Sequence, residues 1–303
     1  MSQKEIYSKD ELELKEVVSV LWKNKRPIIQ TTIFLAISSV VISFMLTNYY
    51  QSSSLLVAKT QSENRGSLSS ISGLASFAGL TLPSSGQDKA IQAIEIIKSR
   101  NFVKHLITFE DVLPSLMAAK HYESSSGKLF YNDDIYDPDT KKWKQEPTYL
   151  KTHLHYINNV LQITRNDETG FIFISVEHIS PIFAKEFLDL IIKEANNILR
   201  ERDLYEATQA LEFLKKQLSK TSLVEVKESI NSLIKVQLET QMLSKVNEDY
   251  VLTVIDSPFV AEDRVRPKRT VIVILTTMLG ALVSMFYFLL RYYYVDELNK
   301  ASE

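Results

Sequence analysis

The densest group of acidic side chains that could do chemistry lies between residues 133 and 139. It comprises Asp133, Asp134, Asp137 and Asp139. A calcium loop needs carboxylates at alternating positions, a turn glycine and a distal glutamate, whereas only Asp137 and Asp139 alternate and two lysines follow them. The same pair fits the D-x-D pattern of glycosyltransferases, but the sequence does not indicate the βαβ array that would hold a sugar nucleotide. We therefore interpret the group as a solvated loop.

Two histidines, His153 and His155, are spaced so that they could share one face of a strand and hold a metal. No third ligand is evident, so we assign no metal. The sequence has no cysteine, no Walker-type phosphate loop and no G-x-S-x-G nucleophile elbow. A glycan-processing enzyme would need an acid and a base paired in a cleft, and no such pair stands out. We predict a protein that is not an enzyme and has no cofactor.

Two uncharged apolar segments decide the class of the protein. They comprise residues 27–47 and 270–290, and basic residues flank both. Each would measure about 31 Å as a helix, which matches the hydrocarbon core of a bilayer. The first segment is too long for a signal peptide and no A-x-A-like site follows it. We predict two transmembrane helices, the first of them an uncleaved anchor.

The distribution of lysine and arginine predicts the topology. The first 26 residues carry six cations, whereas only Lys59 and Arg65 occur in the twenty residues after the first segment. This favours a cytoplasmic head (1–26) and a cytoplasmic tail (291–303). Residues 10–22 of the head have the pattern of an amphipathic helix, which would lie on the cytoplasmic leaflet or form a solvated helix that leads into the first span. Residues 48–269 then lie outside the cytoplasm. The second segment alone favours the opposite orientation, because four cations precede it: Arg264, Arg266, Lys268 and Arg269.

The stretch from Pro181 to Ser257 predicts long helices. It contains no glycine and no further proline, and its apolar residues recur three and four apart. Ser180 and Pro181 suit a helix start. The sequence Ser222-Leu-Val-Glu225 has the spacing of a capping box, so we predict two helices, about 181–219 and 223–250, forming a hairpin. A single long coiled-coil segment is the alternative.

Strands are predicted on both sides of this hairpin. They cover residues 49–59, about 160–165, 171–176 and 251–256. The second and third are joined by a turn that ends at Gly170, which indicates a β-hairpin. The strand after the first transmembrane helix can pair with the strand before the second. We also predict an amphipathic helix over residues 88–107 and an irregular polar segment over 121–148. The fold class is α+β: two transmembrane helices that flank an α/β base with a long helical hairpin.

Two further motifs are candidates for packing. Residues 73–80 form an apolar loop that we expect to pack against the protein interior or another subunit, through Gly73, Leu74, Phe77, Gly79 and Leu80. A poorly ordered loop close to the lipid is the alternative. Near the second span, Pro258 and Pro267 favour an extended approach to the membrane. Within it, Gly280 and Ser284 form a small-xxx-small face that permits close helix contact.

Several of these features together resemble one known family. They are the two-span layout, Gly73-Leu-Ala-Ser-Phe-Ala-Gly-Leu80, Ala93-Ile-Glu-Ile-Ile-Lys-Ser-Arg100, Ile174-Ser-Val-Glu-His-Ile-Ser-Pro181 and the segment from Val254 to Gly280. The chain resembles the polysaccharide co-polymerases of the bacterial inner membrane, the chain-length determinants of lipopolysaccharide O-antigen. Members carry several prolines before the second span, whereas here positions 261 and 264 are Ala and Arg.

The resemblance implies a ring-like homo-oligomer with its central domain (48–269) in the periplasm and both termini in the cytoplasm. It implies a non-catalytic role in which the oligomer sets O-antigen chain length together with the polymerase, with lipid-linked polysaccharide as a further partner and no nucleic acid. Kinase members need a cytoplasmic ATPase domain, for which the thirteen residues after the second span are too few. The alternatives are a co-polymerase for a capsule, exopolysaccharide or shared antigen, and a bitopic sensor or adaptor.

Overall fold

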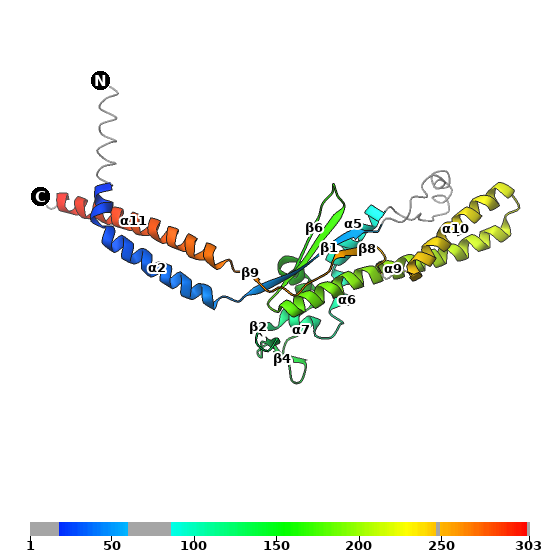
Figure 1. The fold of residues 1–303 in the computed structure, drawn as a ribbon, viewed down its shortest axis with the longest axis horizontal. Coiled ribbons are helices and arrows are strands. Elements are labelled where there is room, and N and C mark those ends of the chain that lie inside the picture. Colours follow the sequence, from blue (N-terminus) through cyan, green and yellow to red (C-terminus); the bar gives the residue numbers. More distant parts are fainter. Residues whose placement is uncertain (1–17, 60–85, 247–248, 302–303) are drawn as a thin grey trace, which may run out of the picture. The chain divides into compact units, whose positions relative to one another are not determined.

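The computed structural model describes residues 18–59, 86–246 and 249–301 (Figure 1). These residues form two compact units, which we describe separately. One unit combines the described residues up to Asn48 with those from Val265 onward, and the other spans Tyr49–Arg264. Two apolar helices in the first unit and a mixture of sheet and long helices in the second confirm the predicted fold class.

The first unit is a pair of antiparallel helices, α2 (Lys25–Met45) and α11 (Arg269–Ala301). Both have the length and apolar composition to cross a membrane, over Lys25–Met45 and Arg269–Tyr292. Residues 18–23, which precede α2, are also helical. They correspond to the end of the predicted amphipathic helix, whose residues 10–17 lie outside the described part of the chain.

The second unit is built on an antiparallel sheet in the order β6-β7-β1-β8. Its strands are β6 (Leu161–Arg165), β7 (Phe171–His178), β1 (Tyr49–Ala58) and β8 (Leu252–Asp256). The predicted pairing of the strand after the first span with the strand before the second is confirmed, because Leu56 lies opposite Val254. This unit ends at Arg264, which is the first residue of a short strand, β9 (Arg264–Arg266).

A single turn sets the register of the β6–β7 hairpin. Asn166 accepts hydrogen bonds from the backbone N–H groups of Glu168 and Thr169, and the Gly170 N–H donates to its carbonyl at 2.8 Å. Gly170 has a φ of +73°, which glycine adopts without a steric penalty. The predicted β-hairpin is therefore confirmed, and Ile163 lies opposite Ile174 in the core-facing register.

The core lies between this sheet and the first half of α9 (Pro181–Lys220). Alternation along β1 directs Ser52, Ser54 and Leu56 inward, and the small serines leave room for a helix over the sheet. The side chains of α9 that fill this layer include Ala184, Leu188, Ile191, Ala195 and Leu199, all at most 1% exposed. Burial of each large aliphatic side chain contributes about 1.5–3 kcal/mol.

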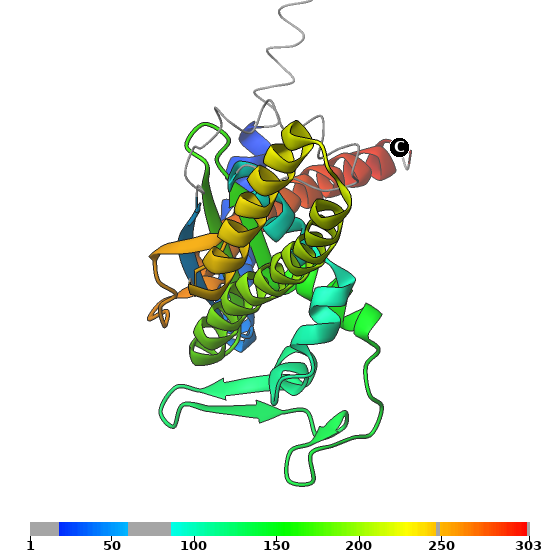
Figure 2. The ribbon, with the colours of Figure 1, turned by 90° about the vertical axis from the view of Figure 1, so that its right-hand side faces the viewer.

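The hairpin of α9 and α10 (Val224–Val246) follows the predicted division closely. Ser180 caps α9 by accepting a hydrogen bond from the Phe183 N–H, and Pro181 occupies the first turn. The chain leaves α9 after Lys220 and re-enters a helix at Val224 (Figure 2). The first backbone bond of α10 runs from the Lys227 N–H to the Leu223 carbonyl, one residue after the predicted cap at Ser222. The two helices lie side by side in both views.

The predicted single helix over residues 88–107 is wrong, because the structure has two helices. They are α5 (Gly86–Lys98) and α6 (Arg100–Leu106). Ser99 separates them in an extended conformation and accepts a hydrogen bond from the Phe102 N–H, so it acts as the cap of a new helix. The resulting bend lets both helices direct buried side chains, such as Ile97 and Phe102, into the core.

The segment predicted to be irregular contains regular structure. A short helix, α7 (Val112–Met117), leads into a two-stranded ribbon of β2 (Ala119–Glu123) and β3 (Lys128–Tyr131). A second ribbon of β4 (Tyr136–Asp137) and β5 (Lys142–Trp143) follows. The prediction failed because the strands are short and the residues between them polar. Aromatic contacts stabilise the second ribbon, with the rings of Tyr136 and Trp143 4.8 Å apart.

Candidate functional sites in the helix pair and at the root of the hairpin

The contact between α2 and α11 depends on small side chains. Gly280 is buried, and a Cβ atom there would lie 2.7 Å from Leu35 Cδ1 on α2. One turn further on, the hydroxyl oxygens of Ser284 and Thr31 are 2.7 Å apart and share a hydrogen bond. The small-xxx-small face thus lies against α2, where the absence of a side chain at position 280 permits close approach.

The opposite faces of the two helices carry large apolar side chains. Phe34, Phe44, Leu279 and Phe286 are each 60% or more exposed. Ser39 and Ser43, by contrast, are 4% and 1% exposed. This arrangement, with large side chains on the outer surface of the helix pair and small or hydroxyl side chains between the helices, is expected for helices surrounded by lipid.

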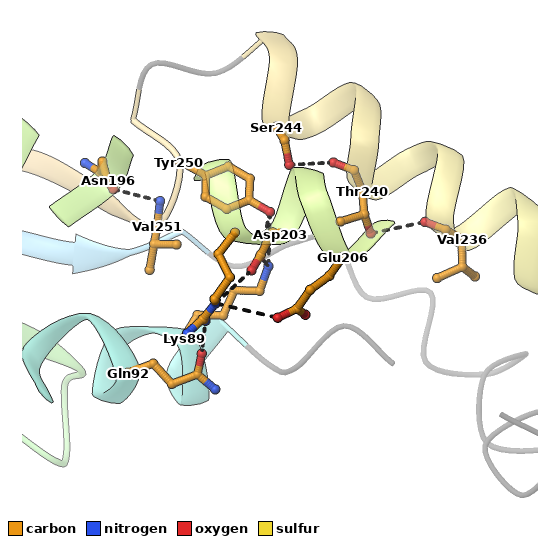
Figure 3. A network of polar contacts seen from close by, with 11 residues as sticks. Lys89, Gln92, Asn196, Asp203, Glu206, Val236, Thr240, Ser244, Tyr250 and Val251 are labelled. Carbon is orange, nitrogen blue, oxygen red and sulfur yellow. Dashed lines mark hydrogen bonds and ion pairs between the residues drawn. The ribbon is translucent and has the colours of Figure 1, made fainter. Parts of the chain in front are cut away.

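A buried ion pair lies at the root of the hairpin, where α9 leaves the core. The Lys89 ammonium on α5 lies 2.6 Å from Asp203 Oδ2 on α9, and their side chains are 8% and 13% exposed. The Tyr250 hydroxyl donates to the same carboxylate oxygen at 2.8 Å and accepts from Lys89 at 3.3 Å (Figure 3). Burial raises the pKa of Tyr250, so its hydroxyl remains a donor at neutral pH. Together these contacts join α5, α9 and the residues before β8.

Asn196 makes the second connection at the root. Its side-chain oxygen accepts from the backbone N–H groups of Val251 and Leu252, and its amide donates to the Leu252 carbonyl at 2.9 Å. The side chain is 3% exposed and its hydrogen-bonding groups are satisfied by one backbone segment. The side-chain amide of Asn196 therefore bonds to the backbone as a neighbouring strand would, and it connects α9 to the start of β8 (Figure 3).

A buried histidine connects the sheet to the start of α9. His178 Nε2 donates to the Ser115 carbonyl at 2.9 Å, and Nδ1 accepts from the Ser180 N–H at 3.1 Å. Burial lowers the pKa of His178 to about 4. The neutral ring, with one donor and one acceptor, matches both partners.

The tip of the hairpin carries an apolar groove. It is lined by side chains of both helices, including Phe213, Leu214, Val226, Ile230 and Leu233, with a volume of about 610 Å³. At the turn, Leu223 and Val224 are 66% and 70% exposed. Large apolar side chains exposed together are typical of contact surfaces.

Two family models match parts of the chain. Residues 10–109 match the family model described as "Chain length determinant protein". This part of the chain therefore carries the domain of the chain length determinant family. Residues 216–293 match a second model, "G-rich domain on putative tyrosine kinase", which begins near the tip of α9 and ends within α11. No curated protein sequence matches the chain.

Two solved structures are similar to this chain. One is a full-length bacterial polysaccharide co-polymerase, with 11% identity and a TM-score of 0.42 over 92% of this chain and 97% of the other. The second is a fragment of WzzB, a polysaccharide co-polymerase from Salmonella Typhimurium, with 14% identity and a TM-score of 0.28 over 72% of this chain and 100% of the other.

The residues considered for metal binding do not come together in the structure. Asp137 accepts hydrogen bonds from the Asp139 and Thr140 N–H groups and from the Thr140 hydroxyl, so it stabilises a turn. His153 and His155 lie on α8 (Tyr149–His155), not on a strand as predicted. Residues two apart on a helix do not share a face. Among the described residues, no group of three metal-ligating side chains occurs.

The remaining predicted residues are in three places. Pro258 is buried after β8, and Pro267 follows β9. Gly280 and Ser284 form the contact with α2 described above. The apolar loop of Gly73, Leu74, Phe77, Gly79 and Leu80 lies outside the described residues.

Sequence reasoning missed the polar residues at the root of the hairpin. Their signal is present, because Asn196 and Asp203 occupy positions of the series 192, 196, 199, 203, 207, 211 and 214 that otherwise carries apolar residues. A polar residue on the buried face of a helix needs a partner. The partners themselves, Lys89 and Tyr250, are 114 and 47 residues from Asp203, which no local pattern reveals.

Proposed function

We propose that this chain is a polysaccharide co-polymerase, a non-catalytic regulator of the length of a surface polysaccharide, specifically lipopolysaccharide O-antigen. It acts as a ring-like homo-oligomer together with the polymerase of the bacterial inner membrane. Lipid-linked polysaccharide is the polymer whose growth it limits.

One observation carries this proposal. The chain length determinant model matches the stretch that contains α2, β1 and the helices up to Leu106, so the match includes a membrane helix together with the base. The fold is consistent with a scaffold, because its two long helices are organised by packing and by a buried polar root. Regulation of a polymerase requires such a positioned surface and no chemistry of its own.

The topology is part of the proposal. Both termini lie in the cytoplasm and residues 48–269 lie in the periplasm. The six cations in the first 26 residues support this orientation through the positive-inside rule. Labelling of single cysteines in intact cells tests it, because the chain contains no native cysteine. A residue such as exposed Tyr205 replaced by cysteine should react with a membrane-impermeant maleimide, whereas cytoplasmic label at that position would reverse the orientation.

Deletion of the gene tests the role. The lipopolysaccharide of the deletion strain should still form a ladder on a silver-stained gel but should lose its preferred length, and a plasmid copy should restore it. A ladder with unchanged length distribution would contradict the O-antigen role. A changed capsule, exopolysaccharide or shared antigen in that strain would assign the co-polymerase to that polymer instead, and no change in any polymer would favour a sensor or adaptor.

A further inference from the structure

Three cations lie within four residues of the sequence at one end of the helix pair, and we call them the basic cluster. The cluster comprises Arg266, Lys268 and Arg269, and Arg269 is the first residue of α11. Asn48 and Phe44, at the end of α2, contact Arg269. Because Thr31 pairs with Ser284 further along the antiparallel helices, this end is opposite to that of Lys25 and Arg291.

The charge of this end departs from the usual pattern of membrane proteins. In the proposed topology the cluster lies on the periplasmic side, where the positive-inside rule disfavours lysine and arginine. The other segment at this end, residues 46–48, contains no charged residue. Among the described residues, Lys268 and Arg269 form no ion pair with a carboxylate. Neither cation is therefore directly paired with a carboxylate in the described part of the chain.

The guanidinium of Arg269 is held in a fixed position. One of its terminal nitrogens donates to Asn48 Oδ1 at 3.0 Å, and its carbon lies 4.6 Å from the centre of the Phe44 ring. Its Nε atom is buried without a hydrogen-bond partner. A held guanidinium loses less side-chain entropy on binding an anion than a mobile one. Lys268, beside it, is exposed.

The location indicates the chemistry of the partner. A cation at the first residue of a membrane span lies at the depth of lipid headgroups, where phosphate is the abundant anion. The planar fork of arginine binds phosphate through two parallel hydrogen bonds, and lysine adds a point charge. Lys268 and Arg269, two adjacent cations that form no ion pair among the described residues, match a headgroup with more than one negative charge better than the single charge of an ordinary anionic phospholipid.

We propose that the basic cluster binds the diphosphate headgroup of a membrane lipid, and that this lipid is the carrier end of the lipid-linked polysaccharide. The inference rests on the proposed function and its topology. It places recognition of the polymer at its lipid phosphate, independently of its sugars.

Binding can be measured on the full-length protein in nanodiscs of phosphatidylcholine, with geranylgeranyl diphosphate as the probe and native mass spectrometry as the readout. We expect binding that Lys268→Gln and Arg269→Gln each weaken by about tenfold, as for loss of one charge-assisted hydrogen bond. Arg269→Lys, which retains the charge but not the fork, should give an intermediate loss. Arg291→Gln, which removes a cation at the opposite end, is the matched control and should bind as the wild type does.

Three results would overturn the inference: no binding of the diphosphate, equal binding of geranylgeranyl monophosphate or phosphatidylglycerol, or an equal loss in the Arg291→Gln control. Circular dichroism of each variant shows whether the helices are retained, and Arg269→Lys keeps the test valid if Arg269→Gln does not fold. Failure here is distinguishable from failure of the proposed function. A strain with intact length control whose protein does not bind the diphosphate would contradict only the inference, whereas diphosphate binding with an unchanged ladder after deletion would contradict only the proposed role.

Discussion

Two helix pairs in this chain solve the same packing problem in opposite ways. In α9 and α10, large side chains such as Leu214, Ile230 and Leu233 face inward, and charged residues cover the outside. In α2 and α11, glycine and hydroxyl side chains face inward and large apolar side chains face outward. The first arrangement uses water to drive association, whereas the second relies on close contact because lipid is as apolar as the helix surface. Mutations should therefore affect the two pairs through different side chains.

The largest effect is expected at the root of the hairpin. Asp203→Ala would leave the buried Lys89 ammonium without its carboxylate, which should cost about 3–5 kcal/mol of unfolding free energy. The measurement is urea unfolding of the detergent-solubilised protein, followed by Trp143 fluorescence in a Trp22→Phe background.

A matched control is Glu206→Ala, which removes an exposed partner of Arg202 and should cost less than about 1 kcal/mol. Equal stability of Asp203→Ala and Glu206→Ala would show that the Lys89–Asp203 ion pair does not stabilise the hairpin. A combined replacement, Lys89→Met and Asp203→Leu with Tyr250→Phe, should recover most of the loss because neither a buried charge nor the Tyr250 hydroxyl that they hold remains.

Acidification should destabilise the second unit and leave the helix pair intact. The pKa of His178 is about 4 in the folded protein and about 6.5 in an unfolded chain. Below pH 6.5 the unfolded chain therefore binds a proton that the folded protein does not, so stability falls as pH decreases from about 6.5 to about 4. The loss approaches about 3 kcal/mol.

Unfolding measured at intervals between pH 7 and pH 4 checks this. His178→Gln should be less stable at pH 7 but should show a flatter profile. A profile as steep as that of the wild type would mean that other groups cause the acid sensitivity.

Truncation within the distal hairpin should have a smaller effect. Leu214→Ala removes a side chain that is 2% exposed, and we expect a cost of about 2 kcal/mol because the open end of the hairpin can partly collapse. Amide hydrogen exchange should show faster exchange in α10, with the sheet unaffected. Leu238→Ala, at a 41% exposed position, should change exchange little, and equal effects would contradict an inward-facing leucine core.

The smallest changes in stability are expected in the pair of α2 and α11. Both a larger side chain and a shorter one at its contact should weaken the pair. Gly280→Ala would press against the flexible end of Leu35 and should cost about 1 kcal/mol. Ser284→Ala removes the hydrogen bond to Thr31, at about 0.6 kcal/mol. Energy transfer between dyes on cysteines at exposed Met45 and Val271, followed during titration with dodecyl sulfate, measures the pairing. Leu282→Ala, at a lipid-facing position, is the control and should not change the midpoint.

Local patterns predicted the parts of the fold that local chemistry determines. The helix start at Ser180 and Pro181, the break between α9 and α10, the turn at Gly170 and the two membrane helices all follow from neighbouring residues. The break at Ser99 was missed because the apolar spacing continues across it, and only the Phe102 hydrogen bond shows that the serine caps a helix. The ribbons of residues 119–143 were missed because their strands are too short to show alternation.

The candidate sites divide in the same way. The close contact at Gly280 could be anticipated, because two small residues four apart in an apolar helix are typical of a close helix contact. The polar root could not, because Lys89, Asp203 and Tyr250 are assembled by tertiary packing. The fixed position of Arg269 likewise depends on Asn48, 221 residues away.

The most direct test of the account is reconstitution of polymer synthesis with a purified O-antigen polymerase and lipid-linked repeat units, with and without this co-polymerase. The polymerase alone should form polymer of broadly distributed length. Addition of the co-polymerase should narrow the distribution around a preferred length, and the co-polymerase alone should transfer no sugar. Sugar transfer by the co-polymerase alone, or an unchanged length distribution in its presence, would contradict a non-catalytic regulator of chain length.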